Sequence, residues 1–137
     1  MNAMYSQPPI LVTHHDHARL EQLLTRVNDQ NPTAEALLEE LDRAKRVDPR
    51  SVPADVVTMN SRVRFRERVS GKERELTLVF PQDAGDGRVS ILTPIGCALL
   101  GLSVGQVIDW MGPTGRTLQL ELLAIPYQPE AAGDFVS

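Results

Sequence analysis

The spacing of apolar residues divides the chain into a helical part and a strand-rich part. In the first part, apolar residues recur at intervals of three and four, which is the spacing of one face of an α-helix. Two such stripes are present, formed by Leu20, Leu23, Leu24 and Val27 and by Leu37, Leu38, Leu41 and Ala44. From residue 55 onward apolar and polar residues alternate, which is typical of half-buried β-strands. The sequence therefore predicts an α+β fold.

The first part is predicted to form a short antiparallel helical hairpin, a coiled coil, over residues 1–50. Thr13, with a carboxylate three residues later, has the spacing of a capping box and marks the first helix start. A polar turn leads to Pro32, which suits the first position of the second helix. Pro49 ends that helix, because a residue before proline avoids helical dihedral angles. Residues up to about 12 are expected to be an irregular lead-in.

The second part, residues 51–137, is predicted to be a mainly antiparallel β domain with one short helix. Five strands are expected, at residues 55–66, 75–80, 88–92, 106–111 and 118–124. Between the third and fourth strands, Thr93 suits a helix N-cap, Pro94 a first helical residue, and Gly101 a helix end.

The amino-acid composition disfavours several classes of protein function. The 137 residues carry a net charge of −4, which disfavours strong sequence-independent binding to nucleic acid or to an anionic membrane. No apolar run approaches the roughly 20 residues that span a bilayer, and the N-terminus lacks the pattern of a signal peptide. The single cysteine, Cys97, excludes an internal disulfide and is expected to pack as a small apolar residue. We therefore expect a cytoplasmic protein without a membrane partner.

No catalytic set can be assembled from the sequence. Nucleophile-elbow, zinc-protease, P-loop and dinucleotide-binding motifs are all missing. His14, His15, Asp16 and His17 form a cluster of metal-ligand types, but adjacent helical residues point apart and no second ligand group has metal-site spacing. We expect no enzymatic activity, no small-molecule substrate, no cofactor and no metal site.

An arginine strip lies on the first predicted strand. Its members are Arg62, Arg64, Arg66 and Arg68, which share one face because they are two residues apart. The strip could face nucleic acid or an acidic protein, or it could be a solvated outer face compensated by Glu67, Glu73 and Glu75. The second interpretation is favoured, because no aromatic residues interleave to stack on bases.

The segment from Ser90 to Gly105 resembles a signature of the bacterial transcript-cleavage (Gre) factors. That signature reads Ser-Pro-hydrophobic-Gly-x-Ala-Leu-Leu-Gly-x-x-x-Gly-Asp, and this chain has Thr93-Pro94-Ile95-Gly96-Cys97-Ala98-Leu99-Leu100-Gly101. Residues 60–63 extend the resemblance. Residues 41–44, 55–61 and 127–134 are similar to one branch of that superfamily, the regulators of nucleoside diphosphate kinase. The resemblance implies an FKBP-like fold for the β domain.

The resemblance also implies a partner. Gre factors dock their FKBP-like domain on the rim of the RNA polymerase secondary channel, so this chain is expected to bind there, to compete with Gre factors and to lie near nucleic acid. The implied contact residues are Thr93, Pro94, Ile95, Gly96 and Leu99. Core packing is the alternative role, above all for Leu99. Effects on nucleoside diphosphate kinase would be indirect, through transcription.

The predicted hairpin tip departs from the Gre pattern. Gre factors carry two tip carboxylates that help to hold a catalytic magnesium ion, a cation that needs several oxygen ligands. Here the tip is Asp29, Gln30 and Asn31, with one carboxylate. Leu92 and Cys97 also replace an acidic and a basic residue that are usual in Gre factors. We therefore expect binding without stimulation of transcript cleavage.

Two alternatives stay open at this point. One is an FKBP-like peptidyl-prolyl isomerase or chaperone, although such a pocket is lined by several aromatic residues. The domain offers few of them, namely Phe65, Phe80, Trp110 and Tyr127. The other alternative is an active transcript-cleavage factor.

Overall fold

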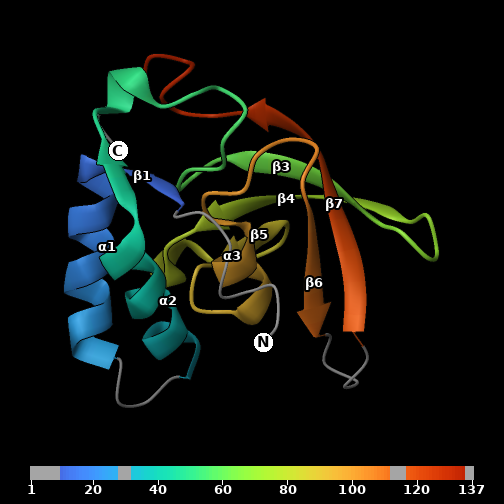
Figure 1. Ribbon diagram of the computed structural model, residues 1–137, viewed down its shortest axis with the longest axis horizontal. Coiled ribbons are helices and arrows are strands. Elements are labelled where there is room, and N and C mark those ends of the chain that lie inside the picture. The colour runs from blue at the N-terminus through green and yellow to red at the C-terminus, as the bar shows by residue number, and fades with distance from the viewer. Residues whose placement is uncertain (1–9, 28–31, 112–116, 135–137) are drawn as a thin grey trace.

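A computed structural model describes residues 10–27, 32–111 and 117–134 of the chain. Helices α1 (His14–Val27) and α2 (Pro32–Arg43) lie side by side at one edge of the molecule, antiparallel, next to a curled sheet (Figure 1). The predicted α+β class is thereby confirmed. None of the helices described is both long and apolar enough to cross a bilayer.

The two helices are bracketed by a pair of short strands that periodicity did not predict. Strand β1 (Leu11–Thr13) pairs in parallel with β2 (Lys45–Val47). The expectation of an irregular lead-in up to about residue 12 was therefore wrong at Leu11 and Val12. The second helix, expected to continue to the residue before Pro49, ends at Arg43 and is followed by β2. Each strand is too short to show a period, and its partner lies on the far side of both helices in the sequence.

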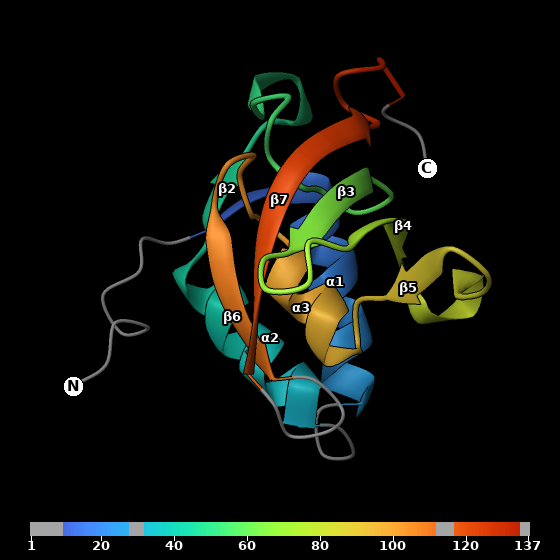
Figure 2. The ribbon, with the colours of Figure 1, turned by 90° about the vertical axis from the view of Figure 1, so that its right-hand side faces the viewer.

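Five strands form the main sheet, in the order β5-β4-β3-β7-β6. They are β3 (Arg62–Glu67), β4 (Glu73–Val79), β5 (Arg88–Ser90), β6 (Val107–Met111) and β7 (Thr117–Tyr127). All neighbours are antiparallel except β4 and β5. Helix α3 (Pro94–Leu99) lies behind the sheet in Figure 2, on the same side as α1 and α2. Two 3₁₀ turns, η3 (Pro49–Ser51) and η4 (Pro81–Asp83), complete the elements.

The first main strand begins later than predicted, at Arg62 instead of residue 55. Asn60 has a left-handed backbone (φ 69°), which interrupts an extended strand. Thr58 and Ser61 are buried although alternation places them on opposite faces, and their hydroxyl oxygens lie 2.9 Å apart. Thr58 also donates to the Glu130 carboxylate at 2.7 Å. Hydrogen bonds to the C-terminal tail thus replace a sheet ladder here.

One apolar core runs through the hairpin and the β domain. Leu20, Leu24 and Leu37 from the hairpin belong to the same buried cluster as Leu78 and Leu99. Such continuity means that each part covers apolar surface of the other. The boundary expected between residues 50 and 51 therefore crosses a shared core.

A candidate docking surface at the start of helix α3

The start of α3 is fixed by its cap. The Thr93 hydroxyl accepts a hydrogen bond from the Gly96 backbone N–H at 3.1 Å and donates to the Ser90 carbonyl oxygen at 2.7 Å. Pro94 follows at the first helical position, where it leaves no hydrogen bond unmade. The predicted N-cap is therefore confirmed, and the first turn is held rigidly against the end of β5.

The five residues proposed as polymerase contacts differ in accessibility. Pro94 is exposed, and Thr93 and Ile95 are half-buried. Gly96 is buried, and a Cβ at that position would collide with the Ser90 carbonyl oxygen. Leu99 is fully buried in the core. Among the five proposed contact residues, accessible surface is thus confined to Thr93, Pro94 and Ile95, and their contact role stays a prediction.

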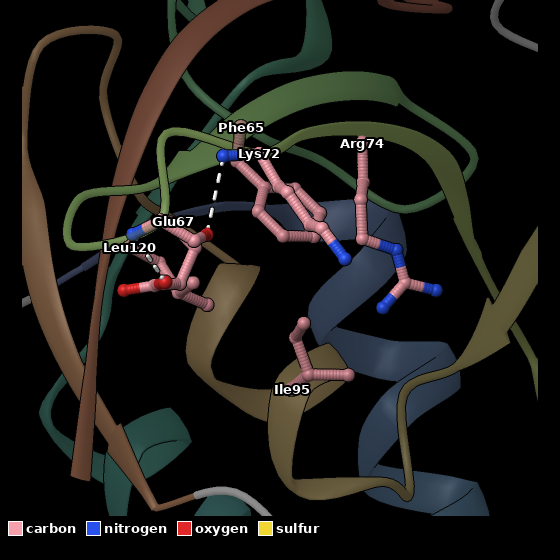
Figure 3. A pocket seen from close by; sticks show the side chains of 7 residues that line it. Phe65, Glu67, Lys72, Arg74, Ile95 and Leu120 are labelled. Atoms are coloured by element: carbon pink, nitrogen blue, oxygen red, sulfur yellow. Dashed lines mark hydrogen bonds between the residues drawn. The ribbon is translucent and has the colours of Figure 1, made fainter.

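Ile95 lies at a pocket of about 290 Å³. Phe65 and Leu120, both nearly buried, provide further apolar lining (Figure 3). The remaining lining residues come from the end of β3, the β3–β4 connection and the start of β4, and they are Glu67, Ser70, Lys72 and Arg74. Sequence reasoning missed this pocket because its residues come from α3, β3, β4 and β7, which only the folded sheet brings together.

The charged groups around the pocket are not equivalent. The Glu67 carboxylate accepts hydrogen bonds from the backbone N–H groups of Val69 (3.0 Å) and Ser70 (2.9 Å), so it stabilises the turn. Lys72 and Arg74 are exposed. No salt bridge to either cation is found within the described part of the chain. The pocket therefore has an apolar wall and a mainly cationic rim.

Two of the four arginines in the strip are compensated by carboxylates of the sheet. Arg64 lies 3.4 Å from the Glu75 carboxylate, a predicted neighbour. Arg66 pairs at 2.8 Å with Glu121, which sequence reasoning did not identify because it lies on β7. The hydrogen bond and charge of Glu121 raise the pKa of the Arg66 guanidinium. These two arginines are thus neutralised within the sheet.

His17 and Cys97, which the sequence offered as candidate functional residues, have surroundings typical of structural roles. His17 is buried, and its Nε2 donates to the Leu41 carbonyl oxygen at 3.2 Å, which links α1 to α2. Burial raises the pKa of the half-buried Cys97 thiol to about 11, which suppresses the reactive thiolate. No cluster of three metal-ligand side chains is found in the described residues. Asp29, Gln30 and Asn31 at the expected tip lie outside them.

The aromatic residues considered for an isomerase pocket are dispersed. Phe65 lines the pocket, whereas Phe80 is buried under the Arg19 guanidinium, 4.2 Å from its ring centre. Tyr127 lies at the end of β7, where its hydroxyl donates to Asp134 at 3.3 Å. The side chain of Trp110 lies outside the described part. The three described aromatic residues therefore form no common cage.

Comparison with known proteins agrees with this arrangement. Residues 52–127 match the family model "Transcription elongation factor, GreA/GreB, C-term", and residues 8–47 match "Rnk N-terminus". The chain is 46% identical over 134 residues to the regulator of nucleoside diphosphate kinase from Escherichia coli strain K12, covering 96% of this chain and 98% of that protein. The chain belongs to the family of regulators of nucleoside diphosphate kinase. In this chain an N-terminal region typical of that family is joined to a GreA/GreB-type C-terminal domain.

The chain is also similar to proteins named as transcription elongation factors. A solved structure titled "Prokaryotic transcription elongation factor GreA/GreB from Nitrosomonas europaea" is 43% identical, with a TM-score of 0.77, and covers 88% of this chain and 100% of that one. Transcription elongation factor GreA of Chlorobium phaeobacteroides is 34% identical over 114 residues, covering 81% of this chain and 68% of that protein. These relatives are named as regulators and transcription factors rather than as enzymes.

Proposed function

We propose that this chain is a non-enzymatic transcription regulator that binds RNA polymerase at the rim of its secondary channel. The observation that carries the proposal is the apolar pocket beside Pro94 and Ile95, in the segment matched to the GreA/GreB C-terminal domain. A rigidly capped helix start next to a preformed pocket suits docking, because little conformational entropy is lost on binding.

In this proposal the regulator acts by occupying the rim of the secondary channel. A chain seated on the channel rim excludes other factors that use the same surface, so it competes with Gre factors. One tip carboxylate, Asp29, supplies too few oxygen ligands to help hold a magnesium ion. The effect on nucleoside diphosphate kinase is then indirect and runs through transcription.

The docking surface is tested by a binding titration with core RNA polymerase. The double variant Pro94→Asp/Ile95→Asp places two charges at the pocket and should weaken binding by at least about tenfold, since a carboxylate buried in an apolar contact is costly. Val104→Asp/Val107→Asp is the matched control, because both are exposed apolar residues that do not line the pocket. Circular dichroism verifies that each variant is folded. Normal binding by a folded double variant would show that the docking face is misassigned.

Competition and cleavage are measured separately. Increasing amounts of a Gre factor should displace the bound chain from core polymerase. In a stalled-complex assay the chain should not stimulate RNA cleavage, and Asp29→Asn should change nothing. Cleavage by the wild-type chain that disappears in Asp29→Asn would favour an active cleavage factor instead.

A further inference from the structure

Strand β4 places positive charge where the core pattern calls for apolar residues. Its inner face, which turns toward the core, carries the buried Leu76 and Leu78. Arg74 lies two residues before Leu76 and directly opposite the buried Phe65, so it projects from that same inner face. Core packing does not explain a guanidinium at this position.

Lys72 adds a second cation on the same side of the pocket. Figure 3 shows the side chains of Lys72, from the connection before β4, and of Arg74, from β4, extending toward the space beside Ile95. The carboxylate of Glu67, the acidic residue of the rim, is engaged by the N–H groups of the turn. In contrast, Arg64 and Arg66 on the outer face each have an acidic partner. The rim therefore carries two cations and one carboxylate, a net positive charge, and neither cation has a salt-bridge partner within the described residues.

The size of the pocket limits what can enter. Its volume of about 290 Å³ lies at the lower end of the ~300–1,000 Å³ typical of small-molecule sites. Phe65, Ile95 and Leu120 line it with apolar surface. A single large side chain from a protein partner fits this space, and groups that flank it would meet the Lys72 and Arg74 rim.

We propose that the pocket receives one apolar side chain from an acidic segment of RNA polymerase, with flanking carboxylates on Lys72 and Arg74. This inference rests on the proposed function and adds the chemistry of the partner segment. The apolar anchor supplies affinity by burial, while the rim charges guide association and select against basic segments. Binding should then weaken with salt more steeply than apolar contact alone predicts.

The test is a titration of the full chain with core RNA polymerase, without nucleic acid, at low and at high salt. Lys72→Glu/Arg74→Glu should weaken binding roughly tenfold or more at low salt and flatten the salt dependence. Arg62→Glu/Arg88→Glu is the control of equal charge change, because both residues are exposed and lie outside the pocket. Circular dichroism confirms that both double variants are folded.

The outcomes separate this inference from the function on which it rests. If the wild-type chain binds and the two double variants lose affinity equally, the acidic-segment inference is wrong and the polymerase-binding function stands. If the loss appears only when DNA and RNA are added to the polymerase, the rim meets nucleic acid and the inference is again overturned. If the wild-type chain does not bind polymerase at all, both proposals fall.

Discussion

At the scale of single residues, two side-chain properties place the proposed docking surface. The Thr93 hydroxyl closes the first turn of α3, and the missing side chain of Gly96 lets the turn approach the Ser90 backbone. The cap was readable from the sequence, because Thr-Pro before an apolar run is a local signal. The close approach at Gly96 was not, since Ser90 becomes its neighbour only when the chain turns back on itself.

Removing the cap should destabilise the domain by a modest amount. Thr93→Ala leaves the Gly96 N–H without its acceptor, and such losses cost about 0.5–2 kcal/mol. Thr93→Ser retains a hydroxyl and should remain close to wild type. Urea unfolding followed by circular dichroism measures the free energy of unfolding of both variants. Equal stability of the alanine and serine variants would contradict the capping role.

Gly96→Ala should be more damaging than the loss of the cap. The added methyl group would collide with the backbone carbonyl of Ser90, which cannot swing away as a flexible side chain would. We expect a loss of about 1–3 kcal/mol, the range for overpacking a buried site. Gly105→Ala is a useful comparison, because its Cβ position is open although its backbone is left-handed (φ 93°). A Gly96→Ala variant as stable as wild type would refute the close contact.

At the scale of elements, the hairpin is joined to the β domain by a buried carboxylate. Asp16 on α1 is 5% exposed, and its Oδ2 accepts a hydrogen bond from the Met59 N–H at 3.1 Å. The sequence correctly indicated Thr13 as the cap of α1. It assigned the Asp16 carboxylate to the same capping box, whereas the carboxylate reaches across to the other part of the chain. Local spacing cannot reveal a partner so far away in the sequence.

This junction should make stability depend on pH. Burial raises the pKa of Asp16 from 3.8 to about 6, the Glu130 charge adds to the rise, and the Met59 hydrogen bond, His15 and Arg19 oppose it. The folded state thus holds the proton to higher pH than the unfolded state does. Protonated Asp16 therefore contributes to the free energy of unfolding fully below about pH 4, and this contribution is lost as the pH rises through 6. At 1.36 kcal/mol per pKa unit, the full change is about 3 kcal/mol.

The variant Asp16→Asn isolates this dependence. It keeps an oxygen acceptor for Met59 but cannot ionise, so it should be more stable than wild type at pH 7.5 and close to it at pH 4. Asp42→Asn, on the exposed face of α2, controls for loss of one negative charge. Urea unfolding at several pH values measures the difference between variant and wild type. A difference that does not change with pH would show that Asp16 is not the titrating group.

At the scale of the whole molecule, the features that local sequence signals determine were predicted, whereas contacts between segments distant in the sequence were not. The α+β class, both hairpin helices and α3 follow from stripes and caps that lie within a few residues of one another. The β1–β2 pair, the Arg66–Glu121 ion pair and the pocket at Ile95 depend on segments that are distant in sequence. The alternation of apolar residues indicated that Phe65 faces the core, but it could not identify the residues that surround it.

The shared core also bears on the proposal that residues 1–50 and 51–137 are distinct regions. The β domain has its own sheet and α3, so a fragment from Val52 to the C-terminus should fold and bind polymerase. It should unfold at lower urea concentration than the full chain, because it exposes Met59 and Phe80, which the hairpin contacts through Asp16 and Arg19. Residues 1–48 alone should be largely unfolded, since two short helices are marginal without a covering surface.

Circular dichroism and a competition titration on both fragments test this division. The full chain should outcompete the fragment from Val52, because the intact core holds α3 and the pocket in place and the hairpin adds contacts of its own. Equal unfolding midpoints for the fragment and the full chain would show that the hairpin contributes nothing to the stability of the β domain. Binding that resides wholly in residues 1–48 would remove the docking surface from the β domain, and with it the role proposed for Pro94 and Ile95.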